Sequence, residues 1–343
     1  MNADRFQAIT DRYNGLRIGI LGDICLDRYL EIDPGRSEIS IETQLTVHNV
    51  IRVRSQPGAA GTILNNLVAL GIGTLYPIGF HGDDGEGYEL RRALAAKAGV
   101  RLDHFVQTSE RRTFTYCKPL LMHPGRAPEE LNRLDSKNWT STPDSVQDQL
   151  LASLEVLAPS LDALILMDQV DIAETGVVTR RLLDGVGRLR ERFPHLFIVA
   201  DSRRGLKGFP SVAFKMNQAE LGTMLGRVCG GDLAEVQAMA LEAAKTNGNA
   251  TFITLAERGI VGAKADGTVA HVPSLPIRGE IDIVGAGDSV TANLTAALAS
   301  GASLAESMEI AMAGASEVIH QLGTTGTASV AQVRNRLALS ARS

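Results

Sequence analysis

The feature that most constrains the fold of this 343-residue chain is a regular alternation of predicted helices and strands from residue 144 onward. The predicted helices cover 144–157, 174–193 and 232–245, and the predicted strands cover 163–167, 196–200, 213–216 and 251–255. Consecutive parallel strands need a crossover, which is usually a helix. The alternation is therefore typical of a mostly parallel sheet with helices on both faces, and it predicts a three-layer α/β fold.

The first half of the chain contributes two more predicted strands and two segments of a different character. Residues 17–22 and 74–79 are short apolar runs that end in glycine and belong in the main sheet. By contrast, residues 28–56 and 112–121 alternate or are rich in β-branched residues, which favours antiparallel strands outside that sheet. We therefore predict a single domain over residues 1–343, with a small β-sheet that acts as a lid.

Small residues at positions 58–61 run directly into an apolar segment that is predicted to be a helix ending at Gly71. Glycine lets a backbone approach a ligand closely, so this turn is a candidate binding element. A further helix is predicted over residues 84–98. The segment 123–143, with prolines and mixed charge, is predicted to be a flexible insertion.

Composition excludes several classes of function. The formal net charge is -5, and the 34 Lys and Arg residues are scattered, which argues against a nucleic-acid or membrane partner and favours a small molecule. Cys25, Cys117 and Cys229 are widely spaced, so neither disulfides nor a zinc site is indicated, and the seven histidines show no metal-binding spacing. Residues 1–10 lack a signal-peptide core, and no apolar run reaches roughly 18 residues. A cytoplasmic location is expected.

The strongest functional signal is Asp282-Ile283-Val284-Gly285-Ala286-Gly287-Asp288, followed by an alanine-rich run at 289–298. Glycines on both sides of an alanine form a tight turn in which backbone N–H groups converge, and a helix that begins there offers an anion site. Asp288 at this helix end could take a proton from an attacking hydroxyl group, which suits phosphoryl transfer. The alternative for the motif alone is a strand-to-helix turn with an Asp cap.

Acidic side chains follow the first predicted strand. Asp23 and Asp27 lie just beyond residues 17–22, where the carboxyl ends of parallel strands bind ligands. An ionised carboxylate accepts hydrogen bonds from sugar hydroxyl groups, so both residues are candidates for binding a sugar. Loop solvation is the simpler role for Asp23 but not for Asp27.

Taken together, these residues resemble the ribokinase-like (pfkB) family of sugar kinases over about residues 16–335. The segment 282–288 matches the Asp-x-x-Gly-Ala-Gly-Asp signature of that family, Asn217–Glu220 matches its Asn-x-x-Glu motif, and Thr254–Gly259 matches its nucleotide loop. Within the family, the chain is similar to the kinase that phosphorylates heptose 7-phosphate at its anomeric hydroxyl group. That similarity is carried by three segments, Gly22–Tyr29, Arg133–Asp135 and Leu322–Thr324.

The resemblance implies ATP and Mg²⁺ as cofactors and a sugar or sugar phosphate as acceptor. It assigns Asp288 as the base and Gly285, Ala286 and Gly287 as the anion hole. The implied acceptor-binding residues are Asp23, Asp27, Gly58, Ala59, Thr62 and Lys118, and the implied nucleotide-binding residues are Asn217, Glu220, Thr254, Glu257 and Gly259. Glu220 would hold Mg²⁺ through water, and Asp282 and the carbonyl of Val284 could face K⁺. A homodimer through the lid is also implied.

The chain departs from the family pattern at several positions. Ala59 and Thr62 replace a glycine and an asparagine near the sugar, and Glu38 and Tyr116 replace basic residues of the heptose-type kinases. Met312 replaces an asparagine near the adenine. These departures leave the acceptor open, and those at 62 and 312 favour the alternative of a sugar- or nucleotide-binding sensor without transferase activity. A Rossmann dehydrogenase is disfavoured because no GxGxxG follows the first strand.

Overall fold

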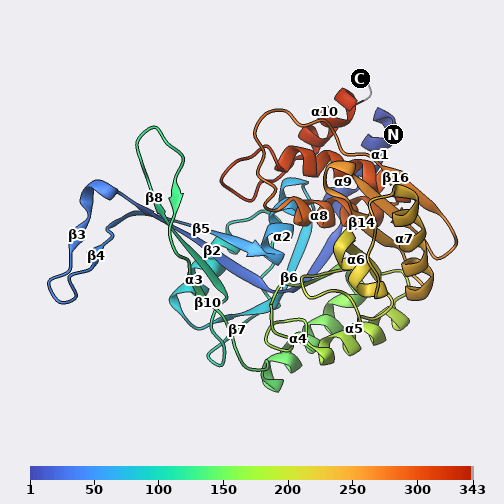
Figure 1. Ribbon diagram of the computed structural model, residues 1–343. Coiled ribbons are helices and arrows are strands. Elements are labelled where there is room, and N and C mark those ends of the chain that lie inside the picture. The colour runs from blue at the N-terminus through green and yellow to red at the C-terminus, as the bar shows by residue number, and fades with distance from the viewer. Residues whose placement is uncertain (341–343) are drawn as a thin grey trace.

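The structure is a computed structural model that describes residues 1–340 (Figure 1). Its central sheet has nine strands in the order β16-β15-β14-β13-β12-β11-β1-β6-β7. These strands are β1 (Arg17–Gly22), β6 (Thr74–Gly82), β7 (Phe105–Thr108), β11 (Ala163–Asp168), β12 (Phe197–Ser202), β13 (Ala213–Asn217), β14 (Thr251–Thr254), β15 (Ile260–Ala263) and β16 (Val269–Val272). Strands β14 to β7 pair in parallel, and β15 and β16 add an antiparallel edge.

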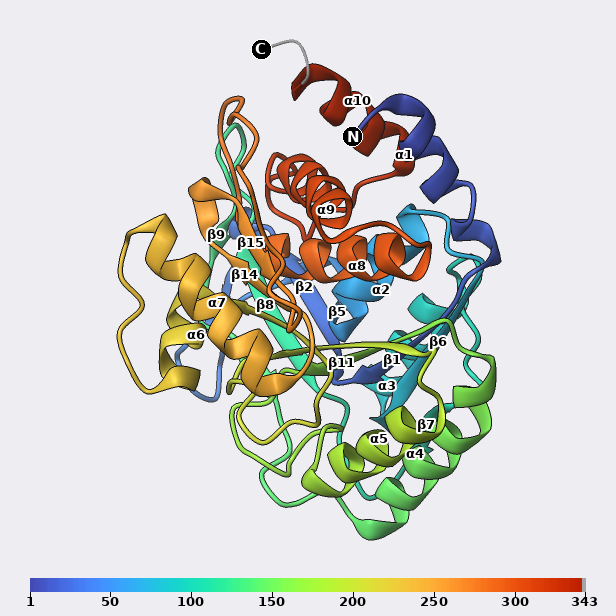
Figure 2. The ribbon, with the colours of Figure 1, turned by 90° about the vertical axis from the view of Figure 1, so that its right-hand side faces the viewer.

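Helices cover both faces of this sheet, so the predicted three-layer α/β fold is confirmed (Figure 2). One layer contains α1 (Ala3–Thr10), α2 (Ala60–Ala69), α3 (Gly85–Ala95), α8 (Ala286–Ala299), α9 (Leu304–Val318) and α10 (Val330–Ser340). The other contains α4 (Asp144–Leu157), α5 (Arg180–Arg192), α6 (Gln218–Leu225) and α7 (Leu233–Asn247). The side chains of β11 alternate between the two layers. Leu164 packs into one core and Ile165 into the other, because successive side chains of a strand point to opposite faces of the sheet.

A second, five-stranded sheet stands apart from the central sheet. It comprises β10 (Leu134–Ser136), β8 (Thr115–Leu121), β2 (Ile24–Ile32) and β5 (Val50–Ala59) in that order, with β9 (Glu129–Glu130) also paired to β8. We call these strands the small sheet. Beyond it, β3 (Glu38–Ile39) and β4 (Thr46–Val47) form a hairpin that projects from the body of the molecule (Figure 1).

Two local predictions were wrong. Helix α5 begins at Arg180 and not at residue 174, because Glu174 has a φ of +68° and the Thr179 hydroxyl caps the helix by accepting the N–H of Leu182 at 3.3 Å. The segment 123–143 was predicted to be a flexible insertion, yet it contributes β9 and β10 to the small sheet. Strands of two or three residues show no periodicity that a sequence pattern can reveal.

The helices that begin at the cavity described below are α2 and α8, which pack against each other in one core. Strand β5 leads directly into α2, and the loop at 282–285 leads into α8. Within residues 1–340, no helix combines the length and the apolar character that crossing a membrane would require.

Candidate active site

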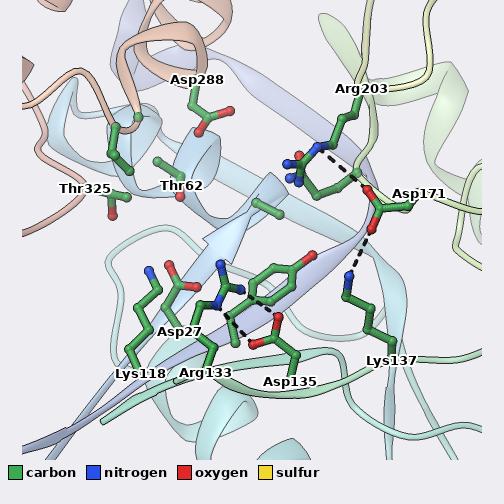
Figure 3. A pocket seen from close by; sticks show the side chains of 15 residues that line it. Asp27, Thr62, Lys118, Arg133, Asp135, Lys137, Asp171, Arg203, Asp288 and Thr325 are labelled. Atoms are coloured by element: carbon green, nitrogen blue, oxygen red, sulfur yellow. Dashed lines mark hydrogen bonds and ion pairs between the residues drawn. The ribbon is translucent and has the colours of Figure 1, made fainter. Parts of the chain in front are cut away.

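A cavity of about 270 Å³ lies between the small sheet and the amino-terminal ends of α2 and α8 (Figure 3). Fifteen residues line it: Asp27, Ala59, Thr62, Tyr116, Lys118, Arg133, Asp135, Lys137, Gln169, Asp171, Arg203, Val284, Gly285, Asp288 and Thr325. Seven of them were predicted from the sequence, namely Asp27, Ala59, Thr62, Lys118, Val284, Gly285 and Asp288. The cavity therefore gathers the predicted base and most of the predicted acceptor-binding residues.

Asp288 lies in the first turn of α8 and faces Asp27 across the cavity (Figure 3). Burial, and next the negative charge of Asp201, raise the pKa of Asp288 to about 7, although Lys215 acts in the opposite direction. Gly285, with a φ of +83°, precedes the helix and lets the chain turn sharply. The N–H of Ala286, which was predicted to belong to the anion hole, donates to the carbonyl of Ile283 at 3.2 Å. The next N–H groups, those of Gly287 and Asp288, lie in the first turn of α8 and are available to an anion next to the carboxylate.

A buried lysine beneath this helix was not predicted. Lys215 in β13 forms an ion pair with Asp201, with 2.8 Å between Nζ and Oδ2. Burial alone would lower the pKa of Lys215, but Asp201 raises it, so the ammonium group stays charged. Thr291 of α8 donates to the same carboxylate at 3.0 Å, and a Cβ on Gly287 would lie 3.1 Å from Lys215 Nζ. The positive charge therefore lies directly against the start of α8.

On the other side of the cavity, Asp27 is surrounded by basic side chains (Figure 3). Burial raises the pKa of Asp27, while the positive charges of Lys118 and Arg133 oppose that rise. Arg133 makes two hydrogen bonds with Asp135, at 2.8 and 3.2 Å, and its guanidinium carbon lies 4.9 Å from the centre of the Tyr116 ring. These contacts hold the guanidinium at the cavity wall.

Two further cations share one carboxylate at the cavity. Lys137 Nζ lies 2.9 Å from Asp171 Oδ2, and Arg203 Nε lies 3.8 Å from Asp171 Oδ1. None of these three residues was predicted. Because they come from three separate segments, no local pattern in the sequence could have linked them.

Asp23 and Gly58, both predicted to bind the acceptor, do not line the cavity. The Asp23 carboxylate is buried and accepts the N–H groups of Gln169 at 2.9 Å and Val177 at 2.7 Å. Burial raises its pKa to about 6. It therefore holds the loop after β11, which supplies Asp171 to the cavity. A Cβ on Gly58 would lie 2.7 Å from the Asp27 carboxylate, so this glycine makes room for Asp27.

The predicted nucleotide-binding residues lie at the carboxyl ends of two neighbouring strands. Asn217 of β13 is in register with Thr254 of β14. Asn217 and Glu220 form a capping box at the start of α6, in which Glu220 Oε2 accepts the Asn217 N–H at 2.7 Å. Glu257 lies on the exposed turn that follows β14, and Gly259 has a φ of +92° beside the backbone of Val272.

The residues of this region are better suited to binding a divalent metal through its water ligands than to coordinating it directly. One oxygen of Glu220 is engaged in the capping box, which leaves the other for a metal-bound water. Burial raises the pKa of Glu220, as does nearby Asp201, so a positive charge there would favour the ionised form. Among residues 1–340, no group of three or more His, Cys, Asp and Glu side chains could hold a metal directly.

Asp282 and Val284, the two residues predicted to face K⁺, lie in the loop before α8, which hydrogen bonds of the Asp282 carboxylate stabilise. Asp282 Oδ1 accepts the N–H of Val284 at 3.0 Å, and its Oδ2 accepts the N–H of Gly323 at 3.3 Å.

Two of the departures from the family pattern lie away from the cavity. Glu38 is exposed on the hairpin, and Met312 is buried in the core.

Comparisons with known proteins identify relatives that match most of this chain. The Bifunctional protein HldE of Gluconacetobacter diazotrophicus is 29% identical over 321 residues, which cover 94% of this chain and 63% of the relative. The protein of the same name from Hyphomonas neptunium is 29% identical over 342 residues, covering 98% and 66%. The chain thus spans less than two thirds of the length of these curated relatives.

Solved structures show the same fold. Phosphofructokinase-2 of Escherichia coli, solved in complex with substrates and products, has a TM-score of 0.72 at 18% identity, covering 95% of this chain and 100% of that one. The ribokinase of Arabidopsis thaliana, complexed with ribose and ATP, has a TM-score of 0.68 at 16% identity, covering 94% and 98%. The predicted ribokinase-like fold is confirmed. The model of the pfkB family of carbohydrate kinases matches residues 25–331, so this chain belongs to that family.

Proposed function

We propose that this carbohydrate kinase transfers the γ-phosphoryl group of ATP to a hydroxyl group of a sugar or sugar phosphate, with Asp288 as the general base. The observation that carries the proposal is the position of Asp288, a half-buried carboxylate at a helix amino terminus that faces Asp27 across the cavity. A pKa of about 7 suits a base that works near neutral pH.

In the proposed reaction, Asp27 accepts a hydrogen bond from one acceptor hydroxyl while Asp288 removes the proton of another. The oxygen so activated bonds to the γ-phosphorus, the bond between that phosphorus and the β–γ bridging oxygen breaks, and ADP leaves. The N–H groups of Gly287 and Asp288 and the charge of Lys215 stabilise the negative charge on the transferred group. Hydrated Mg²⁺ beside Glu220 would neutralise the remaining phosphate charges.

The acceptor belongs to the sugars or sugar phosphates, and heptose 7-phosphate is the first compound to test because of the motifs quoted above. Of the basic residues that line the cavity, Arg133 is paired with Asp135, and Lys137 and Arg203 are paired with Asp171. Lys118 is the remaining cation, and it supports an acceptor with an anionic group. Tyr116 also lines the cavity, and it replaces a basic residue of the heptose-type kinases. The acceptor of this chain can therefore differ from heptose 7-phosphate.

The proposal is tested by ADP release with a panel of free and phosphorylated sugars. In Asp288→Asn, turnover should fall by at least roughly 10² to 10⁴ because proton abstraction is lost. ATP should still raise the melting temperature of the variant as it does in the wild type, since the nucleotide-binding residues are unchanged. Turnover at the wild-type rate would show that Asp288 is not the base.

We further propose that the small sheet is a lid and that two subunits associate through it. Its outer strand β5 and the hairpin expose apolar side chains, namely Ile39, Ile41, Leu45, Val47, Val50, Ile51 and Val53. Exposed apolar groups on an edge strand favour association with another copy. A two-fold dimer would cover these residues and close each cavity from above.

The dimer is tested by light scattering of Leu45→Asp and Val47→Asp. Each charge should weaken association and raise the KM of the sugar, since the lid would no longer be held closed. Val228→Asp is the matched control, because Val228 is 85% exposed and belongs to neither the small sheet nor the hairpin. A wild-type protein that is monomeric and fully active would rule out the dimer.

A further inference from the structure

The turn between β5 and α2 contains an alanine in a backbone conformation that favours glycine. Ala59 has φ +53° and ψ −120°, where the Cβ of an ordinary residue meets the neighbouring backbone. Within residues 1–340, Gln44, Glu174 and Ala256 also have positive φ, but Ala59 is the one of the four that lines the cavity. Strained residues persist where the surroundings fix them, and they are frequent at ligand sites.

The surroundings fix the backbone of Ala59 from both sides. Ala59 still pairs with Ile24 of β2, and the next residue, Ala60, already begins α2. The N–H of Ala60 donates to the carbonyl of Asp23 at 3.1 Å. The chain must therefore change from strand to helix within one residue. A glycine would make this change without strain, so the methyl group of Ala59 is retained at a cost in stability.

Ala59 lines the same cavity as the proposed acceptor-binding carboxylate of Asp27. The neighbouring Gly58 provides the space that Asp27 occupies, since a Cβ there would lie 2.7 Å from the carboxylate. Ala59 follows immediately and lines the same cavity as Asp27. Gly58 thus leaves space for Asp27, whereas Ala59 reduces the space in the cavity by one methyl group.

Two threonines continue this wall toward the start of α8. A Cβ on Gly285 would lie 3.5 Å from Thr62 Cγ2 and 3.4 Å from Thr325 Cβ. Together with Ala59, these residues line one side of the cavity, whereas Asp27, Arg133 and Asp135 line another. A sugar that binds its hydroxyl groups to Asp27 would bring one of its carbons next to Ala59.

We propose that Ala59 determines acceptor specificity, because its methyl group excludes sugars with a substituent larger than hydrogen at the carbon that faces Ala59. This inference rests on the proposed function and adds a size limit to it. One carbon more or less in such a contact changes kcat/KM by roughly 10- to 200-fold. The strain at Ala59 is tolerated in return for this selectivity.

The experiment compares Ala59→Gly with Ala60→Gly. Each variant introduces one glycine into the same turn, but only the first removes the cavity methyl group, because Ala60 is fully buried beneath the turn. The probes are aldopentoses, aldohexoses and aldoheptoses, free and as terminal phosphates, assayed with ATP and Mg²⁺ by ADP release. Sugar-induced shifts in Tm report acceptor binding independently of phosphoryl transfer.

In Ala59→Gly, kcat/KM for at least one disfavoured sugar should rise roughly tenfold or more relative to the best sugar. Its Tm should be equal to or above that of the wild type, since the strain is released. In Ala60→Gly, the ratios of kcat/KM should be unchanged, and Tm should fall by roughly 1–2 °C because glycine weakens a helix.

Each contrary outcome has its own meaning. Ratios of kcat/KM that stay within twofold of wild type in Ala59→Gly would overturn the specificity role, provided that the wild type phosphorylates a sugar. A fall in Tm equal to that of Ala60→Gly would overturn the claim of strain. If neither the wild type nor Ala59→Gly phosphorylates or binds any sugar of the panel, the proposed function fails and the size limit fails with it.

Discussion

The two sides of the cavity are built from charges in different environments. Beneath α8, the side chains of Lys215 and Asp201 are 9% and 11% exposed, and both belong to strands of the central sheet. On the acceptor side, Lys137 and Asp171 are 31% and 54% exposed and lie in loops. The buried side is fixed by the packing of the sheet, whereas the exposed side can change without disturbing the core. In the proposed mechanism, phosphoryl transfer and acceptor choice therefore depend on separate parts of the molecule.

The largest effect should come from removing one partner of the buried pair. Lys215→Met leaves the Asp201 charge buried with Thr291 as its remaining partner, and such a loss costs about 3–5 kcal/mol in the free energy of unfolding. Lys137→Met removes an exposed pair and should cost less than about 1 kcal/mol. Urea unfolding of both variants measures the difference. Equal losses in the two variants would contradict the comparison.

The difference between the two sides also decides what the sequence could predict. The site residues of segment 282–288 were predicted because its glycines and Asp288 are close together in the chain. A short stretch of sequence therefore contains all the residues that form the start of α8. Lys215 was overlooked because a single lysine within a strand gives no pattern, although a lysine in the apolar segment 213–216 was a usable signal. Lys137, Asp171 and Arg203 could not be predicted, since only the fold brings them together.

The fold itself followed from periodicity wherever elements are long. The alternation after residue 144 predicted β11 to β14 together with α4 and α7, since burial on both faces makes each strand a continuous apolar run. The start of α5 was misplaced because it depends on the positive φ of Glu174, and β9 and β10 are too short to show a pattern. The strain at Ala59 was equally hidden, since alanine is ordinary in both strands and helices.

A smaller effect is expected from substituting Glu220, the residue proposed to hold Mg²⁺ through water. Glu220→Gln keeps the capping hydrogen bond possible but removes the negative charge that would face hydrated Mg²⁺. The Mg²⁺ concentration for half-maximal activity should rise roughly 10- to 100-fold, as is typical when an outer partner of a metal is removed. The KM of the sugar should be unchanged, because Glu220 does not line the acceptor cavity. An unchanged Mg²⁺ titration would assign this role to another acid.

The central claim is that Asp288, half-buried and with a raised pKa, acts as the base for phosphoryl transfer, and the pH dependence of kcat/KM tests it most directly. The ionised carboxylate is the active form, so kcat/KM should rise about tenfold per pH unit below 7 and level off above it, since burial raises the pKa to about 7. Circular dichroism at each pH separates this loss from acid unfolding. In Asp288→Asn, the residual kcat/KM should lack this rise. A wild-type profile that is flat from pH 5.5 to 8.5 would contradict the account.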